Sequence, residues 1–146
     1  MKTLKKDQLI KSLKISENFL MIDSVDIDKI KKIAIGKKNF NNKTWFFKDH
    51  FIDEPVMPGS LQIEAMLQTT VSMLYLLKGD NKNKILIIKE TTNFFNKIDS
   101  KGQLVIKSQI TQKKKGFIEA KSEIKFKKIK VSESIFRFID PSNFKI

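Results

Sequence analysis

Hydrophobic and polar positions alternate with a period of two along six stretches of this chain. In the clearest stretch, Gly116–Phe126, one face carries Ile118, Ala120, Ser122, Ile124 and Phe126, and the other carries Glu119, Lys121, Glu123 and Lys125. Such alternation is typical of an antiparallel strand with one covered face. The pattern predicts strands over Phe19–Ile27, Lys29–Phe40, Lys84–Phe95, Gln103–Gln112, Gly116–Phe126 and Val131–Ile139.

Two other segments follow helical spacing instead. Leu4, Leu9, Ile10 and Leu13 predict a short amphipathic helix over Thr3–Leu13. Ser60–Leu77 is apolar almost all round, which predicts a helix buried on most of its surface, with a stop signal at Gly79. A sheet wrapped around this one long helix gives a single α+β domain over residues 1–146.

Composition narrows the classes of function. The net charge of +13 is almost entirely lysine, with Arg137 as the one arginine, which disfavours a nucleic-acid surface. The absence of cysteine and the single histidine exclude disulfides and cysteine or multi-histidine metal sites. The polar residues within Ser60–Leu77 disfavour a membrane span, and the N-terminal segment lacks the apolar core of a signal peptide. We therefore expect a cytoplasmic protein without a metal or redox cofactor.

The candidate chemistry lies in the segment HFIDEPVMPGSLQIEAMLQ, residues 50–68. Glu64 is a lone carboxylate in the apolar helix, so it should pair with a lysine, be protonated or border a cavity. The residues that follow it on the same helix face, Gln68, Val71 and Tyr75, suit the wall of a pocket. His50 is a candidate base, and the amide of Gly59, at the start of the helix, can stabilise a developing oxyanion. Together these groups suit proton abstraction next to a carbonyl.

This segment resembles the active-site motif of the FabZ/FabA-type 3-hydroxyacyl-acyl-carrier-protein dehydratases, which have the hotdog fold. The matching residues are His50, Phe51, Pro55, Val56, Met57, Pro58, Gly59, Leu61, Glu64, Ala65, Met66 and Gln68. The resemblance implies that His50 is the base and Glu64 the acid, and that Gly59 polarises the thioester carbonyl. It also implies that Phe51, Met57, Pro58, Leu61 and Gln68 bind substrate. Ile52 and Asp53 depart from the usual Pro-Gly pair of the family.

The same resemblance implies an assembly and a partner. The substrate is carried on the phosphopantetheine of acyl carrier protein, and the arm runs beside the central helix. The enzyme is a homodimer, or a trimer of such dimers, in which each site takes its histidine from one subunit and its acid from the other. The expected reaction converts a 3-hydroxyacyl to a trans-2-enoyl thioester. The alternative is a hotdog protein that binds acyl thioesters, or hydrolyses them, without dehydratase activity.

Overall fold

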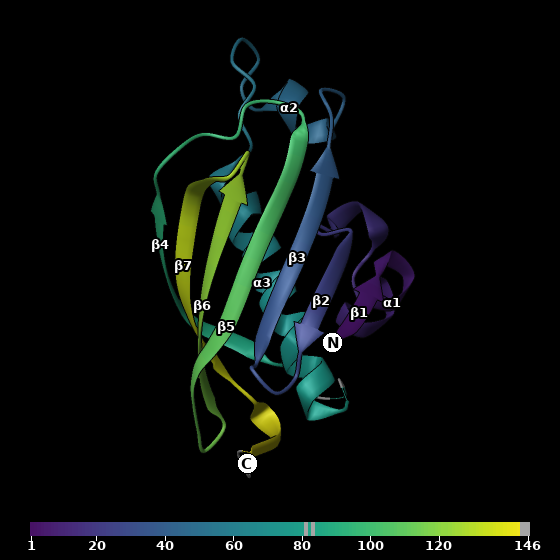
Figure 1. Cartoon of the computed structure of the whole chain (residues 1–146), viewed down its shortest axis with the longest axis vertical. Coiled ribbons are helices and arrows are strands. Elements are labelled where there is room, and N and C mark those ends of the chain that lie inside the picture. Colours follow the sequence, from purple (N-terminus) through teal and green to yellow (C-terminus); the bar gives the residue numbers. More distant parts are fainter. Residues whose placement is uncertain (81, 83, 144–146) are drawn as a thin grey trace.

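A computed structural model of the chain, which describes residues 1–80, 82 and 84–143, contains one antiparallel sheet curved around a long helix. The sheet has seven strands in the described residues, in the order β1-β2-β3-β5-β6-β7-β4 (Figure 1). Their bounds are β1 Lys2–Lys5, β2 Ser24–Asp28, β3 Ile33–Phe40, β4 Leu86–Phe94, β5 Gly102–Lys114, β6 Phe117–Phe126 and β7 Ile129–Ile139. The helices are α1 Lys6–Leu13, α2 Trp45–Asp49 and α3 Gly59–Lys78, with short 3₁₀ turns η1 Glu17–Phe19 and η2 Pro141–Asn143. The predicted α+β hotdog architecture is confirmed.

The central helix ends where the sequence predicts. Gly79 caps α3 in the left-handed region, with φ of 85°, and its amide donates to the carbonyl of Tyr75 at 2.9 Å. A residue without a Cβ adopts this conformation at no steric cost. None of the helices in the described part of the chain combines the length and apolarity needed to cross a bilayer.

The N-terminal helix is shorter than its hydrophobic pattern predicts. Lys2–Lys5 form β1, which pairs with β2, so the expectation of a helix from Thr3 is wrong. Leu4 is buried as a strand residue, and the helical spacing of the later apolar residues holds only from Lys6 onward. Strand pairing with residues that lie 19–25 positions away therefore overrides a local helical preference.

The first long strand prediction is also displaced. Residues Glu17–Phe19 form η1, and β2 does not begin until Ser24, so Phe19–Ile27 is a strand only in its second half. A turn follows β2, in which the Asp28 carboxylate accepts hydrogen bonds from the amides of Ile30 and Lys31. The hydrogen bond from Lys31 contributes most to lowering the pKa of Asp28 below its ordinary value.

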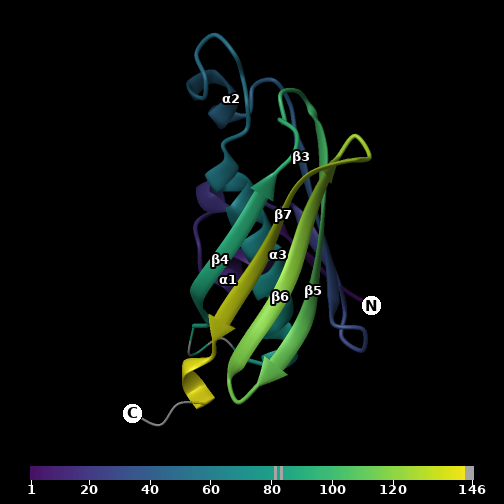
Figure 2. The same cartoon turned by 90° about the vertical axis from the view of Figure 1, so that its left-hand side faces the viewer.

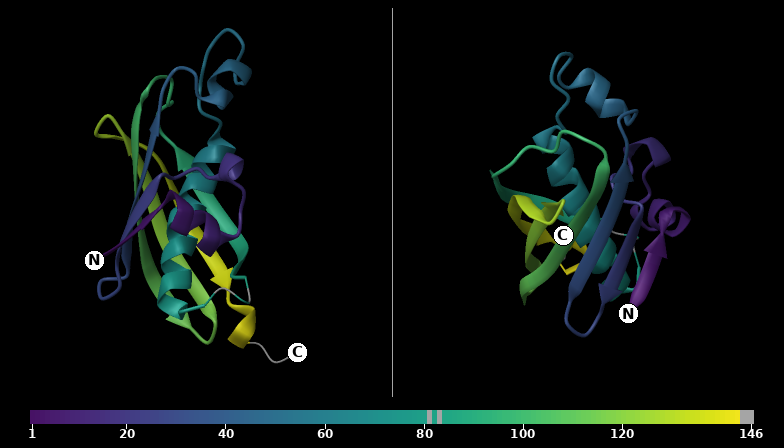
Figure 3. Two further views of the ribbon diagram at one scale, coloured as in Figure 1. Left: turned by 90° about the vertical axis from the view of Figure 1, so that its right-hand side faces the viewer. Right: turned by 45° about the horizontal axis from the view of Figure 1, so that its top comes forward.

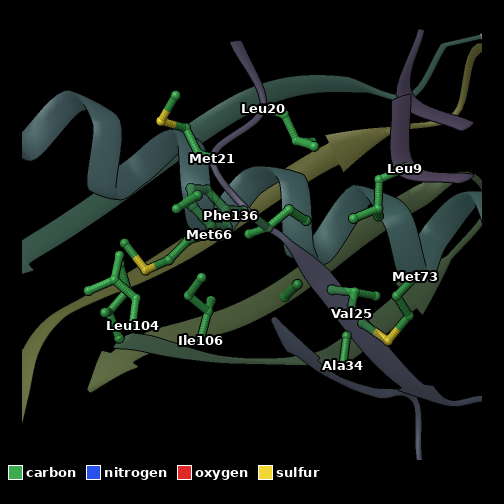
Figure 4. Packing of buried hydrophobic residues seen from close by; sticks show 14 of the residues in the cluster. Leu9, Leu20, Met21, Val25, Ala34, Met66, Met73, Leu104, Ile106 and Phe136 are labelled. Atoms are coloured by element: carbon green, nitrogen blue, oxygen red, sulfur yellow. The ribbon is translucent and has the colours of Figure 1, made fainter. Parts of the chain in front are cut away.

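The concave face of the sheet packs on α3, and α1 covers part of the other side of that helix (Figures 2 and 3). Figure 4 shows Met66 of α3 pointing toward Leu104 of β5, and Met73 toward Val25 and Ala34. The alternation predicted for β6 is confirmed, since its five alternate inward residues from Ile118 to Phe126 are buried. The helix approaches β3 closely: a Cβ added to Gly36 would lie 2.3 Å from Thr69 Oγ1.

A row of hydroxyl side chains crosses the sheet beneath the central helix. Ser108, Ser122, Ser134 and Thr92 stand directly opposite one another on β5, β6, β7 and β4. Ser108 and Ser122 share a hydrogen bond of 2.7 Å, as do Thr92 and Ser134, and Thr70 of α3 donates to Ser108 at 3.0 Å. These hydrogen bonds satisfy polar groups that would otherwise be costly to bury.

An ion pair joins the segment that follows β7 to the C-terminal end of the central helix. Lys78 Nζ lies 2.9 Å from Asp140 Oδ1, and Ser142 donates to the same carboxylate oxygen through its hydroxyl and its amide. Burial raises the pKa of Asp140, but the hydrogen bonds from Ser142 and Lys78 outweigh it and leave the pKa below its ordinary value. The ionised carboxylate therefore stabilises the fold.

Candidate active site

A closed loop between α2 and α3 holds the single histidine. His50 follows α2, and the loop stands beyond the ends of the strands at one end of the molecule (Figures 1 and 2). The amide of Val56 donates to the carbonyl of His50 at 2.7 Å, and the amide of Met57 donates to the carbonyl of Ile98 at 2.8 Å. These hydrogen bonds close the loop on itself and fix it to the segment after β4.

The imidazole is held in one orientation by the same loop. His50 Nδ1 lies 2.9 Å from the carbonyl oxygen of Val56, which can only accept a hydrogen bond. Nδ1 therefore carries the hydrogen, and in the neutral ring Nε2 keeps its lone pair. The ring of Phe51, which is exposed, lies against the imidazole with centroids 3.8 Å apart and an interplanar angle of 31°. His50 thus has the tautomer that a general base needs.

An ion pair ties the exposed part of the loop to the rest of the protein. Glu54 Oε1 lies 2.6 Å from Lys97 Nζ, and this hydrogen bond raises the pKa of Lys97 above its ordinary value. Asp53, which replaces the family glycine, lies beside Glu54 in the exposed part of the loop. The departure from the family pattern is therefore placed on the loop surface, three positions after His50.

The first turn of α3 presents Gly59. Pro58 is the residue before the helix, and the Gly59 amide is among the amides that have no partner within the helix. A Cβ at this position would lie 2.8 Å from Cζ of Phe94, so the missing side chain lets that ring cover the start of the helix. The partial positive charge of the helix N-terminus favours an anionic oxygen at this point.

Gln62 and Val56 are functional candidates that the sequence did not single out. Gln62 is buried and donates through Nε2 to the carbonyl of Met57 at 3.3 Å, which steadies the chain just before the helix. Its Oε1 has no hydrogen-bond partner among the described residues. The sequence feature that could have identified Gln62 is its polar side chain within an otherwise apolar helix. The contact of Val56 is made by its backbone, which sequence reasoning does not identify.

Glu64 borders a cavity, which is one of the three situations that the sequence predicts for this carboxylate. The cavity has a volume of about 190 Å³, and Glu64, Gln68, Val71 and Tyr75 of α3 all contribute to its wall. The stripe predicted from helical spacing is therefore confirmed. Glu64 is partly rather than fully exposed to solvent, and its Oε1 accepts a hydrogen bond from Gln68 Nε2 at 3.0 Å.

Gln68 connects Glu64 to the segment before β2. Its side chain is 4% exposed. Nε2 also donates to the carbonyl of Phe19 at 2.9 Å, and Oε1 accepts from the amide of Met21 at 2.7 Å. With both ends of the amide engaged, Gln68 has a fixed orientation and holds the Glu64 carboxylate in place.

The predicted site residues fall into two groups. Glu64 and Gln68 line the cavity, whereas the other predicted residues are absent from its lining: His50, Phe51, Met57, Pro58, Gly59 and Leu61. Met57 is fully buried and packs in the core, and Leu61 is partly buried against it. Within one chain, the candidate base and the candidate acid therefore do not share this cavity.

A larger cavity lies elsewhere in the molecule. It has a volume of about 410 Å³ and is lined by residues around the β5–β6 turn, including Lys114, Phe117 and Arg137. It contains neither His50, Glu64 nor Gly59. Its size alone does not make it a catalytic site, because the groups suited to acid–base chemistry lie at the other positions.

Comparison with known proteins gives a family match over most of the chain. A family model described as the FabA-like domain matches residues 15–134. A Clostridium novyi protein named 3-hydroxyacyl-[acyl-carrier-protein] dehydratase FabZ is 50% identical over 68 residues, which cover 46% of each chain. The protein of the same name from Fusobacterium nucleatum is 29% identical over 122 residues, covering 83% of this chain and 86% of the relative.

Solved structures show the same fold at low sequence identity. A protein from Helicobacter felis has a TM-score of 0.69 at 17% identity, covering 92% of this chain and 98% of its own. A hypothetical thioesterase from Streptococcus pneumoniae, solved with coenzyme A, has a TM-score of 0.61 at 9% identity, covering 79% of this chain and 82% of its own. At such identities the likeness concerns the fold alone.

Proposed function

Because the chain belongs to the family of FabA-like domains, we propose that it dehydrates 3-hydroxyacyl thioesters carried on acyl carrier protein. The product is the trans-2-enoyl thioester. The relatives named as FabZ dehydratases support this reaction, and the match with the Fusobacterium nucleatum protein extends over most of both chains. The structural observation that carries the proposal is the hydrogen bond from His50 Nδ1 to Val56, which leaves Nε2 available as a base.

In the proposed reaction, His50 Nε2 takes the proton from the carbon next to the thioester carbonyl. The Gly59 amide accommodates the negative charge that develops on the carbonyl oxygen. Glu64, in its protonated form, gives a proton to the 3-hydroxyl as the carbon–oxygen bond breaks, and water leaves as the double bond forms. Gln68 supports this step because it orients the Glu64 carboxyl group.

We propose that the base and the acid meet between two subunits. The cavity that Glu64 borders excludes His50, and Ile87 of the edge strand β4 forms part of its wall. The free edge of β4 also carries Leu86 and Ile88, which are 48% and 51% exposed. An edge strand that begins with exposed apolar residues favours pairing with another strand at that point. Edge-to-edge pairing of two β4 strands would bury these residues beside the cavity.

The surface charge suits the proposed partner. The chain carries a net charge of +13, and an acidic carrier protein would be attracted by this field. We include in the proposal a cytoplasmic homodimer, or a trimer of dimers, that needs no cofactor beyond the phosphopantetheine of its substrate.

A coupled assay tests the proposal. Enoyl product is followed from a short 3-hydroxyacyl-carrier-protein thioester, with release of free thiol recorded in parallel. His50→Ala and Glu64→Gln should each lower kcat by about 10²–10⁴-fold, the usual contribution of general acid–base catalysis. Glu17→Gln is a matched control, because Glu17 is an exposed glutamate paired with Lys6 and should be dispensable.

Two results would overturn the dehydratase assignment. Thiol release without enoyl product would make the protein a thioesterase on the hotdog scaffold. Inactivity on both carrier-bound and coenzyme A thioesters, together with tight binding of either, would make it an acyl-thioester binding protein. In either case Asp53→Gly would restore the family residue, and any gain of dehydratase activity would assign the loss to that position.

A further inference from the structure

Two cavities follow one another along the same face of α3. The first is the cavity beside Glu64, and the second, of about 490 Å³, lies at the other end of the helix between α1 and Gly79. Residues 64, 68, 71 and 75 of α3 line the first cavity, and residues 75, 76 and 79 line the second. Since positions three and four apart share a helix face, the two cavities lie in sequence along one stripe.

Tyr75 stands at the boundary between the two cavities. Among the described residues, Tyr75 alone lines both cavities. The side chain is 8% exposed, and the hydroxyl oxygen accepts a hydrogen bond of 3.3 Å from the amide of Ile85, which also lines the first cavity. The aromatic ring is therefore anchored where the first cavity ends.

We propose that Tyr75 sets the upper limit on the length of the acyl chain that the enzyme accepts. This inference rests on the proposed dehydratase function. Glu64, the proposed acid, marks one end of the first cavity, so the 3-carbon of the substrate lies there. The remaining carbons extend along the apolar wall formed by Leu67, Val71 and Phe138 until they reach the Tyr75 ring.

The small volume of the first cavity implies that only a limited length of acyl chain fits. Its volume of about 190 Å³ is smaller than the roughly 300–1,000 Å³ typical of sites for drug-sized ligands. It therefore suits a short to medium acyl chain. The second cavity lies within that typical range, and its wall is formed in part by Leu4 and Leu76. Lys11, Lys14 and Asp80 also line the second cavity. Removing the ring of Tyr75 would connect the two cavities and give a long acyl chain room to extend beside Leu4 and Leu76.

The test compares kcat/KM for 3-hydroxyacyl-carrier-protein substrates with four-, eight- and sixteen-carbon chains. In the wild type we expect the value for the longest chain to be the lowest. Tyr75→Ala should raise the ratio of the longest to the shortest substrate by at least about tenfold, the discrimination that a methylene or two provides in an apolar pocket. Tyr75→Phe keeps the ring and should retain the wild-type ratio.

A second pair of variants distinguishes the effect of the Tyr75 boundary on chain length from the effect of the overall size of the first cavity. Val71→Ala enlarges the first cavity without opening its end, so it should not admit the longest chain. Val71→Phe shortens the cavity and should lower the eight-carbon to four-carbon ratio by at least about tenfold. If Tyr75→Ala fails to fold, Tyr75→Leu, which also removes the aromatic ring, replaces it in the test.

The outcomes distinguish the two proposals. If no substrate of any length is dehydrated, the proposed function fails. If the short substrate is dehydrated but Tyr75→Ala does not change the length profile, the dehydratase stands and the role of Tyr75 is refuted. The role of Tyr75 would also be refuted if Val71→Ala and Tyr75→Ala raised kcat/KM for the longest substrate equally. The width of the cavity, rather than its boundary at Tyr75, would then set the limit.

Discussion

Gln68 offers a sharp test of how the site is held together. Its amide group makes hydrogen bonds with the amide of Met21, the carbonyl of Phe19 and the carboxylate of Glu64. Gln68→Met replaces the amide with an apolar group of similar length. The substitution therefore removes all three hydrogen bonds while it keeps most of the packing in this part of the core.

The expected cost follows from the groups left behind. The amide of Met21 is buried, and leaving a buried donor without a partner costs about 1–3 kcal/mol. The Phe19 carbonyl and the Glu64 carboxylate are only partly buried, so water can replace the lost amide there. We therefore expect Gln68→Met to lower the free energy of unfolding by about 1–3 kcal/mol. At roughly 2–4 °C per kcal/mol for a chain of this size, Tm should fall by roughly 2–12 °C.

Urea unfolding at fixed protein concentration measures the change. Gln103→Met is the matched control, because Gln103 is exposed and donates one surface hydrogen bond to Asn39. The control should stay within about 0.5 kcal/mol of the wild type. If Gln68→Met is equally harmless, the Gln68 hydrogen bonds do not hold the segment before β2 against α3. In that case Gln68 does not fix the orientation of Glu64 either.

Three further predictions concern other close contacts and one carboxylate. Gly36→Ala should lower the free energy of unfolding by about 1–3 kcal/mol in urea titrations, because the new Cβ would lie 2.3 Å from Thr69 Oγ1. Gly59→Ala should keep the protein folded, because the half-exposed ring of Phe94 can move away, yet lower kcat in the dehydratase assay by about 10–100-fold, because the displaced ring changes the surroundings of the Gly59 amide. The ionised Asp140 should stabilise the fold above its ordinary pKa of 3.8 and lose this contribution as the pH falls below that value, which urea unfolding at several pH values measures.

Each of these predictions has its own control. Thr69→Ala should remove most of the penalty of Gly36→Ala when the two are combined, and additive losses would contradict the proposed clash. Phe94→Leu should restore part of the activity of Gly59→Ala, and no recovery would assign the loss to the helix itself. Asp140→Asn should flatten the acid branch of the stability curve, and an unchanged branch would place the titrating group elsewhere.

The sequence was sufficient for features that depend on local periodicity. The two-residue alternation of β6 placed its inward face correctly, and the spacing of Glu64, Gln68, Val71 and Tyr75 predicted the cavity wall. In both cases the pattern within a single strand or helix is enough to identify the face that points inward. A strand shows its buried face by alternation, and a helix shows its stripe by steps of three and four.

The remaining features depend on contacts between distant segments. Lys2–Lys5 form a strand because β2 offers it a partner, and nothing within those residues signals this pairing. The role of Gln68 depends on the backbone of residues 19–21, and the histidine tautomer depends on a carbonyl group of Val56. Hydrogen bonds to backbone groups do not depend on the type of residue that provides them, so only the folded structure identifies these partners.

The row of hydroxyls across the sheet has a consequence for how this protein can change over evolutionary time. Ser122 is hydrogen-bonded to Ser108 on β5 and β6, and Ser134 to Thr92 on the next two strands, β7 and β4. Replacing Ser108 with alanine removes the partner of buried Ser122, and replacing Thr92 removes the partner of buried Ser134, whereas replacing both members of a pair removes the need for the hydrogen bond. We expect substitutions at these positions to occur in pairs among related sequences, with a single change tolerated only briefly before its counterpart follows.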